Sequence, residues 1–264
     1  MQEGPNSLSS RLEVIIGFRM YEVGLVYDMT KAYQSISTGP VEKHVRRIVW
    51  RWGNVEEPWE IFAYNVVTFG DQIAGLILEL VKKMAAELGS SIDREASHQI
   101  NHRTYVDDGA GGGSRAQVER FRGKRVNGTY DGTLPQILDL VGLKLKAMVA
   151  SGDTDEETIQ LIGDKVLGHT WRPTADEFVF TVTVNLSRKK RGTRTGRDLT
   201  VADIPNLLGF TFTRRNLLGF VMAQYDPMGL ICPLLVILKI QLRKLYCTDS
   251  DLSWDDKIPD NQKS

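Results

Sequence analysis

The segment Arg103-Thr-Tyr-Val-Asp-Asp-Gly109 places two neighbouring carboxylates where the chain is expected to reverse direction. A short strand is expected over 103–106, followed by a tight turn at 107–109. The glycine-rich run 109–113 lacks the lysine and the spacing of a phosphate-binding loop, so it predicts a flexible exit from that turn. On its own, such a pair of aspartates indicates either a simple turn or a metal site, and short patterns of this kind often arise by chance.

A third carboxylate, Asp28, follows the apolar run 24–27 and ends a second predicted strand. Asp28, Asp107 and Asp108 offer hard oxygen ligands, and magnesium is usually held by one or two carboxylates together with substrate phosphates. Two such ions ~3.5–4 Å apart can activate an attacking hydroxyl and stabilise a leaving oxygen. The three aspartates are therefore the candidate catalytic and metal-binding residues.

The rest of the chain alternates between helical and strand patterns. Helices are expected over residues 8–18, 71–88, 90–101, 114–122, 134–148, 214–223 and 233–245. Strand pairs are expected at 44–52 with 59–67 and at 165–171 with 177–184. Antiparallel strand pairs mixed with helices predict an α+β fold rather than a doubly wound sheet.

The composition is typical of a globular protein, with 42% hydrophobic and 25% charged residues among 264. The formal net charge is zero, which argues mildly against binding to phosphates. However, Arg188, Lys189, Lys190 and Arg191 concentrate positive charge in one polar segment. That run predicts either a nucleic-acid contact or a solvated loop.

Two further features bear on the cellular setting. Cys232 and Cys247 form no disulfide or metal framework, so a reducing, intracellular environment is expected. The most apolar stretch, 217–238, contains an aspartate and two prolines. These residues predict broken core helices and argue against a membrane span.

Three segments resemble those of reverse transcriptases, in the same order along the chain. Tyr105-Val-Asp-Asp108 resembles the signature turn, Asp28-Met-Thr-Lys-Ala-Tyr33 the first catalytic segment, and Val67-Thr-Phe-Gly70 the template-contacting segment between them. Later segments resemble the Bel/Pao group of LTR retrotransposons. They lie at 166–180, 213–218, 225–233 and 252–259, so the resemblance spans nearly the whole chain.

This resemblance implies the palm of a reverse transcriptase, in which an antiparallel sheet packs on helices, with partial fingers. Residues 1–185 would form that part and would include a primer-grip-like hairpin at 164–184. A basic linker would follow at 186–212, and then a helical segment like a thumb or connection, with a polar tail, at 213–264. The chain would be an excised or degraded part of a Pol polyprotein, because no protease, RNase H or integrase region is evident in it.

The resemblance also implies roles for single residues. Asp28, Asp107 and Asp108 would be the catalytic, metal-binding triad, joined by the backbone carbonyl of Met29. Tyr33 would be the steric gate that disfavours a ribose 2′-hydroxyl. Tyr105, Phe69 and Gly70 would also contact the substrate. Leu167 and Gly168 would belong to the primer grip.

The implied reaction is attack of a primer 3′-hydroxyl on a deoxynucleoside triphosphate, copying an RNA or DNA template with two Mg²⁺ ions, or Mn²⁺ in their place. The implied setting is a cytoplasmic virus-like particle or the nucleus, beside the protease, RNase H and integrase of a complete element. The alternative is a catalytically inactive nucleic-acid-binding remnant of a retroelement, adopted by a host.

Overall fold

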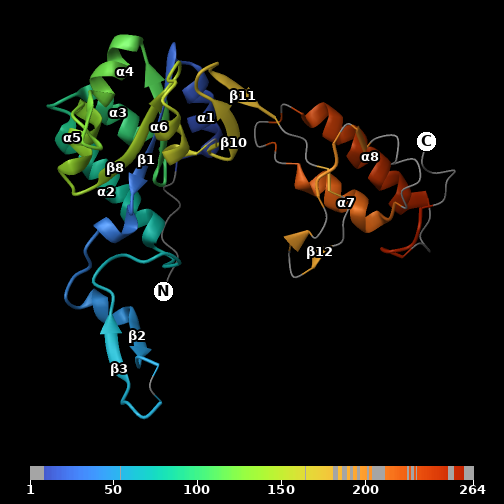
Figure 1. The fold of residues 1–264 in the computed structure, drawn as a ribbon, viewed down its shortest axis with the longest axis horizontal. Coiled ribbons are helices and arrows are strands. Elements are labelled where there is room, and N and C mark those ends of the chain that lie inside the picture. Colours follow the sequence, from blue (N-terminus) through green and yellow to red (C-terminus); the bar gives the residue numbers. More distant parts are fainter. Residues whose placement is uncertain are drawn as a thin grey trace. The chain divides into compact units, whose positions relative to one another are not determined.

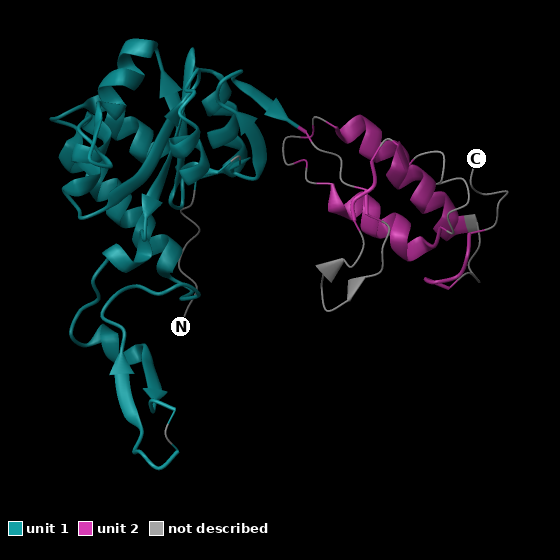
Figure 2. Ribbon diagram, viewed as in Figure 1, with its two compact units in different colours: residues 1–179 teal, residues 180–264 magenta. Residues whose placement is uncertain are grey.

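The fold is α+β, as predicted, with antiparallel sheets and helices in two compact units (Figures 1 and 2). Unit 1 is Met1–Val179 and unit 2 is Phe180–Ser264. The computed structural model describes residues 9–53, 55–163, 165–180, 184–185, 189–190, 193–194, 197–200, 202–203, 212–224, 226, 229, 231–248 and 253–258. Most of the linker expected at 186–212 thus lies outside the described residues.

In unit 1 the helices are α1 (Arg11–Arg19), α2 (Ala74–Gly89), α3 (Arg94–His102), α4 (Arg115–Arg122), α5 (Thr133–Asp139) and α6 (Glu156–Ile162). Its strands are β1 (Val23–Thr30), β2 (Arg47–Trp50), β3 (Glu60–Ala63), β4 (Thr104–Tyr105), β5 (Asp108–Gly113), β6 (Arg125–Val126), β7 (Thr129–Tyr130), β8 (Lys144–Ala150), β9 (Lys165–Val166), β10 (His169–Arg172) and β11 (Glu177–Val179). Two 3-10 turns, η1 (Tyr33–Ser35) and η2 (Glu42–Val45), follow β1.

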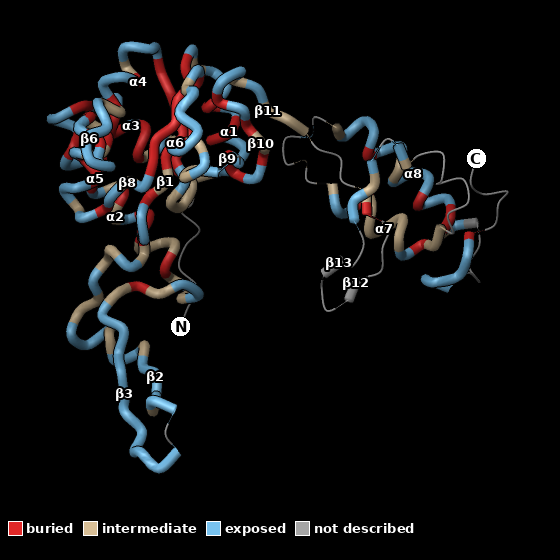
Figure 3. The backbone as a smooth tube through the Cα atoms, viewed as in Figure 1, coloured by how far each residue is buried: buried red, intermediate tan, exposed pale blue. Residues whose placement is uncertain are grey.

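The centre of unit 1 is a four-stranded antiparallel sheet in the order β4-β5-β1-β8. Alternate residues of β1, from Val23 to Met29, join the core formed with helices α2 to α5. The intervening residues face the other way, where Phe18 of α1 packs against Gly24. Both faces of β1 are therefore buried along most of its length, as the red tube in Figure 3 shows.

The glycines after the two aspartates form a strand rather than the flexible exit that was predicted. Residues 109–113 are buried in β5, which pairs with β1 along its length. Gly109 lies directly opposite Tyr27, and a Cβ at position 109 would overlap the Tyr27 ring. Glycine is used here for close approach of a neighbouring side chain, not for mobility.

The prediction of a helix over 134–148 is wrong for the second half of that segment. Helix α5 ends at Asp139, and residues 144–150 form β8, the strand that pairs with β1. Gly142 has φ +76°, a backbone conformation that stops a helix. Beyond it Leu143, Leu145 and Ala147 alternate with lysines, which is the period of a strand.

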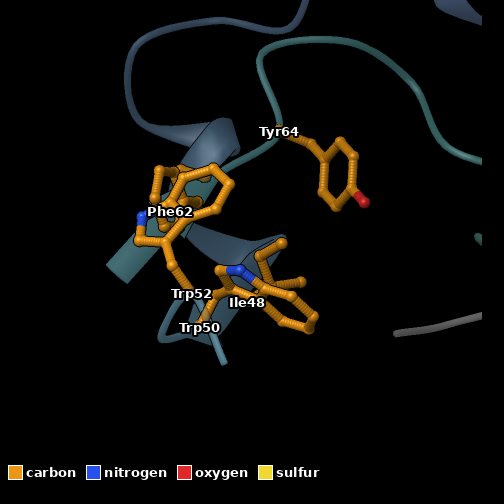
Figure 4. A pocket seen from close by; sticks show the side chains of 6 residues that line it. Ile48, Trp50, Trp52, Phe62 and Tyr64 are labelled. Atoms are coloured by element: carbon orange, nitrogen blue, oxygen red, sulfur yellow. The ribbon is translucent and has the colours of Figure 1, made fainter. Parts of the chain in front are cut away.

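Strands β2 and β3 form a hairpin within the two segments predicted as strands, with Ile48 opposite Phe62. All eight residues of the two strands are exposed. One face of the hairpin lines an open pocket of about 290 Å³ with apolar and aromatic side chains (Figure 4). Its lining residues are Ile48, Trp50, Trp52, Phe62, Ala63 and Tyr64.

Strands β9, β10 and β11 form a separate three-stranded antiparallel sheet. The predicted hairpin with its turn at 173–176 is present between β10 and β11, while β9 and β10 are joined by a second tight turn at Leu167–Gly168. Trp171 of β10 packs edge-on against Phe18, with ring centroids 5.2 Å apart. Asp176 forms an ion pair with Arg19 at 2.7 Å, so this sheet is anchored to α1.

Unit 2 contains the predicted helices α7 (Arg214–Ala223) and α8 (Cys232–Thr248) and the short pair β12 (Lys189–Lys190) and β13 (Thr193–Arg194). Thr213 and Asn216 cap the start of α7. The Arg214 guanidinium donates a hydrogen bond to the Leu245 carbonyl at 2.5 Å, which ties α7 to α8. No helix in the part of the chain that the structure describes is long and apolar enough to cross a membrane.

The contact of Gly109 with Tyr27 leads to a stability prediction. Gly109→Ala should lower the free energy of unfolding by about 1–3 kcal/mol, the usual cost of overpacking a well-filled site. Urea denaturation monitored by circular dichroism measures this cost. In a Tyr27→Val background the same substitution should cost much less, because the overlapping ring is gone. An equal cost in both backgrounds would show that the ring is not the reason for glycine at position 109.

Candidate functional site

Asp107 lies on a two-residue hairpin turn, and Asp108 is the first residue of the strand that follows it. Tyr105 pairs with Asp108, so the loop consists of Val106 and Asp107, one residue earlier than predicted. Val106 has φ +57°. A positive φ at the first loop residue alone is typical of a type II′ turn, where glycine is favoured. A β-branched residue held in this conformation is strained by ~1–3 kcal/mol, a type of strain that is often found at functional sites.

The sheet register brings the third carboxylate to this turn. Asp28 of β1 lies directly opposite Asp108 of β5, and the Met29 amide donates a hydrogen bond to the Asp107 carbonyl at 3.3 Å. The prediction that the strand ends at Asp28 is wrong, because β1 continues to Thr30. Directly opposed residues point to the same face of a sheet, so two of the three carboxylates are neighbours by backbone pairing alone.

The pKa values of both aspartates at the turn are raised. Partial removal from water, followed by the charges of Asp107 and Asp28, raises the pKa of Asp108 to about 6. Burial and then the charge of Asp28 raise the pKa of Asp107, while the lysine at position 82 lowers it. Asp108 is still exposed on one side, so its carboxyl remains accessible from solvent.

A β-bulge places a lysine beside these carboxylates. Asp28 pairs with Ala147 and Met29 with Leu145, so Lys146 is an extra residue on β8. Its ammonium lies 3.0 Å from Asp28 Oδ2. Bulges often redirect a side chain next to a functional site, which is what this one does.

Magnesium suits the donors of this site, which are all oxygen atoms. The described residues contain no group of three or more His, Cys, Asp or Glu side chains gathered closely enough to hold a metal ion. Because magnesium commonly uses one or two carboxylates plus substrate phosphates, a ready-made set of three ligands is not required.

Two of the predicted substrate residues lie together near the turn. The Tyr33 and Phe69 rings meet edge to face, with centroids 5.1 Å apart. Burial, and then the nearby Asp107 and Tyr105, raise the pKa of Tyr33, which places this ring within electrostatic range of the carboxylates. Gly70 follows Phe69 in a left-handed conformation, with φ +88° and open space around it.

Tyr105 ends the strand before the turn and lies beside an arginine of α1. The Arg11 guanidinium is 4.9 Å from the centroid of the Tyr105 ring and donates a hydrogen bond to its hydroxyl at 3.4 Å. The side chain is therefore held in place by α1.

The other predicted contacts are on separate elements. Leu167 and Gly168 form the tight β9–β10 turn, with φ +50° and +95°. Lys189 and Lys190 form β12 in unit 2, paired with β13 where a loop was predicted. Arg188 and Arg191 lie outside the described residues.

Three charged residues near the turn were not predicted from the sequence: Lys146, Lys82 and Glu79. Lys146 was hidden by its assignment to a helix. Lys82 and Glu79 form an ion pair in α2, with their side chains only 1% and 3% exposed. A signal was available, because Lys82 is four residues after buried Leu78 and three before buried Ala85, on the apolar face of the helix.

The raised pKa of Asp108 predicts a pH-dependent stability. An ordinary aspartate titrates near 3.8, so ionisation of Asp108 opposes folding, and stability is lost as the pH rises from about 4 through about 6. Asp108→Asn should therefore raise the melting temperature at pH 8 and have little effect at pH 4. Asp139→Asn, at an exposed aspartate of α5, is the matched control. A variant that is equally stabilised at both pH values would contradict the assignment.

The Lys146–Asp28 ion pair predicts competition with a divalent cation. The pair is partly exposed, and such pairs are worth ~0.2–1 kcal/mol, so Lys146→Met should tighten Mn²⁺ binding by about 1.5- to 5-fold. Lys144→Met removes the same charge from an exposed position of the same strand and should have a smaller effect. Titration of Mn²⁺ by electron paramagnetic resonance compares the two. Weaker binding by Lys146→Met would show that the lysine assists the cation instead.

Comparison with known protein families gave one match, in unit 2. Residues 213–264, about a fifth of the chain, match the family model of the Pao retrotransposon-like RNaseH-like domain. A comparison with curated proteins gave no match. The matched segment was interpreted from sequence as thumb- or connection-like, and no RNase H region had been expected in this chain. The match supports a Pao-type retrotransposon Pol region.

Proposed function

We propose that unit 1 is the palm of an RNA-directed DNA polymerase, a reverse transcriptase of the Bel/Pao type. The observation that carries this proposal is the backbone pairing of Asp28 with Asp108 beside the strained Val106–Asp107 turn. This pairing supports the proposal because it joins two of the three carboxylates that the sequence singled out, from positions 80 residues apart. The likeness of residues 213–264 to a Pao retrotransposon domain supports the same origin.

In this proposal Asp28, Asp107 and Asp108 would hold two Mg²⁺ ions together with the phosphates of a deoxynucleoside triphosphate, and the Met29 carbonyl is a further candidate ligand. The ions would supply charge neutralisation and an activated primer 3′-hydroxyl. The protein's contribution is to position these groups before the substrate arrives. Mn²⁺ would take the same oxygen ligands.

The aromatic pair beside the turn is the proposed contact with the nucleotide substrate. Tyr33 is half-buried against Phe69 and lies within electrostatic range of Asp107. A ring fixed there would overlap a ribose 2′-hydroxyl and so favour deoxynucleotides, which is selection by exclusion. Gly70, with open space around its Cα, leaves room for a template base.

The second candidate function is a nucleic-acid-binding remnant without polymerase activity. The Lys146 contact to Asp28 favours it, because an ammonium already neutralises one of the three carboxylates. A protein of this kind would bind primer–template in a salt-dependent manner without extending it. Its binding would also survive loss of Asp107.

Primer extension on an RNA template with Mg²⁺ separates the two candidates. Asp107→Asn should reduce extension by about two orders of magnitude or more, because it removes a charge that the transition state needs. Asp139→Asn should leave extension unchanged. Extension that is unaffected by Asp107→Asn would overturn the catalytic assignment. Binding without extension in the wild-type chain, lost at high salt and unchanged in Asp107→Asn, would establish the second candidate.

A further inference from the structure

Helix α2 carries an ion pair that is almost completely buried behind the carboxylate turn. Lys82 Nζ lies 2.8 Å from Glu79 Oε2, one helical turn earlier. Charged side chains are almost never buried to this extent unless they are paired, since removing two charges from water costs several kcal/mol per ion. A pair of this kind contributes little net stability, so its stability alone does not explain its presence.

The ammonium of Lys82 is directed at the strand that leads into the turn. Nζ donates a hydrogen bond to the Thr104 carbonyl at 3.4 Å, and Thr104 is completely buried. The Thr104 hydroxyl is in turn 2.6 Å from the Tyr27 hydroxyl. Tyr27 lies over Gly109, the first residue after Asp108.

These contacts reach both strands of the hairpin from the core side of the sheet. Thr104 pairs with Gly109, so Lys82 fixes one strand through Thr104, and Tyr27 contacts the other through Gly109. Asp28 and Asp108 lie at positions adjacent to Tyr27 and Gly109, and therefore point to the opposite face.

We propose that the Glu79–Lys82 pair is a positioning device for the carboxylate turn, in which Lys82 fixes the Thr104 carbonyl and Glu79 holds Lys82. The inference deepens the proposed function, on which it rests for its catalytic meaning. Lys82 touches no substrate and acts through the backbone of β4. Its loss should therefore disturb the spacing of Asp107 and Asp108 from Asp28 more than it disturbs the fold.

The experiment uses a paired substitution, because Lys82→Met alone leaves Glu79 buried without a partner. Glu79→Leu/Lys82→Met replaces both charges with apolar groups of similar volume, a change that is often neutral or stabilising for the fold. The double variant should keep its melting temperature and bind Mn²⁺ about 10- to 100-fold more weakly, the usual effect of removing a group that supports metal ligands. Lys82→Arg, which keeps the donor and the charge, should recover most of the binding.

Lys83→Met is the matched control, because it removes a lysine from the next position of the same helix. Its Mn²⁺ affinity should stay within about twofold of wild type, because Lys83 is partly exposed, unlike the buried Lys82. Wild-type Mn²⁺ affinity in the double variant would overturn the proposal.

Hydrogen exchange tests the positioning role without relying on metal or activity. The double variant should exchange faster in the segment 104–110, where the Ala110 amide donates to the Arg103 carbonyl, while α5 exchanges at its wild-type rate. Unchanged exchange in 104–110 would overturn the proposal even if metal binding were altered. Failure of the proposed function would look different: Asp107→Asn would then bind Mn²⁺ as wild type does, whatever the exchange rates show.

Discussion

The arrangement of the candidate site depends on one backbone pairing, that of Asp28 with Asp108 across β1 and β5. Like charges placed directly opposite each other in a sheet are destabilising, and a third carboxylate follows from the adjacent turn. Partial burial, and then the neighbouring charges of Asp107 and Asp28, raise the pKa of Asp108 to about 6. Shifted pKa values often cluster at functional sites, which is why the proposed function places its chemistry at this cluster.

The rest of unit 1 holds this unfavourable cluster in place. The central sheet is buried on both faces, and the small residues of β5 let Tyr27 pack directly over the strand. Below the sheet, Lys82 and Glu79 fix the strand that enters the turn. Above it, Lys146 is turned towards Asp28 by a bulge in β8. Two lysines from different elements therefore act on one carboxylate turn from opposite faces of the sheet.

The sequence predicted the order of the aspartates, the turn and most helices, because local periodicity and turn chemistry decide those features. Predictions from the sequence were wrong for the elements whose structure depends on tertiary packing. The glycines at 111–113 look flexible in isolation and become a buried strand beside β1. The segment 134–148 has apolar residues at both helical and strand spacing. Its second half is a strand because Gly142 stops the helix and the residues after it pair with β1. Lys82 and Lys146 gain their roles only from neighbours distant in sequence.

The most direct test of the account is a crystal structure of the chain grown with Mn²⁺, in which anomalous scattering locates the ion. The account predicts a peak bound by carboxylate oxygens of Asp28 and the 107–108 turn at about 2.1 Å, the distance typical of small divalent cations with oxygen ligands. It also predicts that the Lys146 ammonium leaves Asp28 when the ion binds. A structure with Mn²⁺ bound elsewhere, and Asp28 still paired with Lys146, would contradict it.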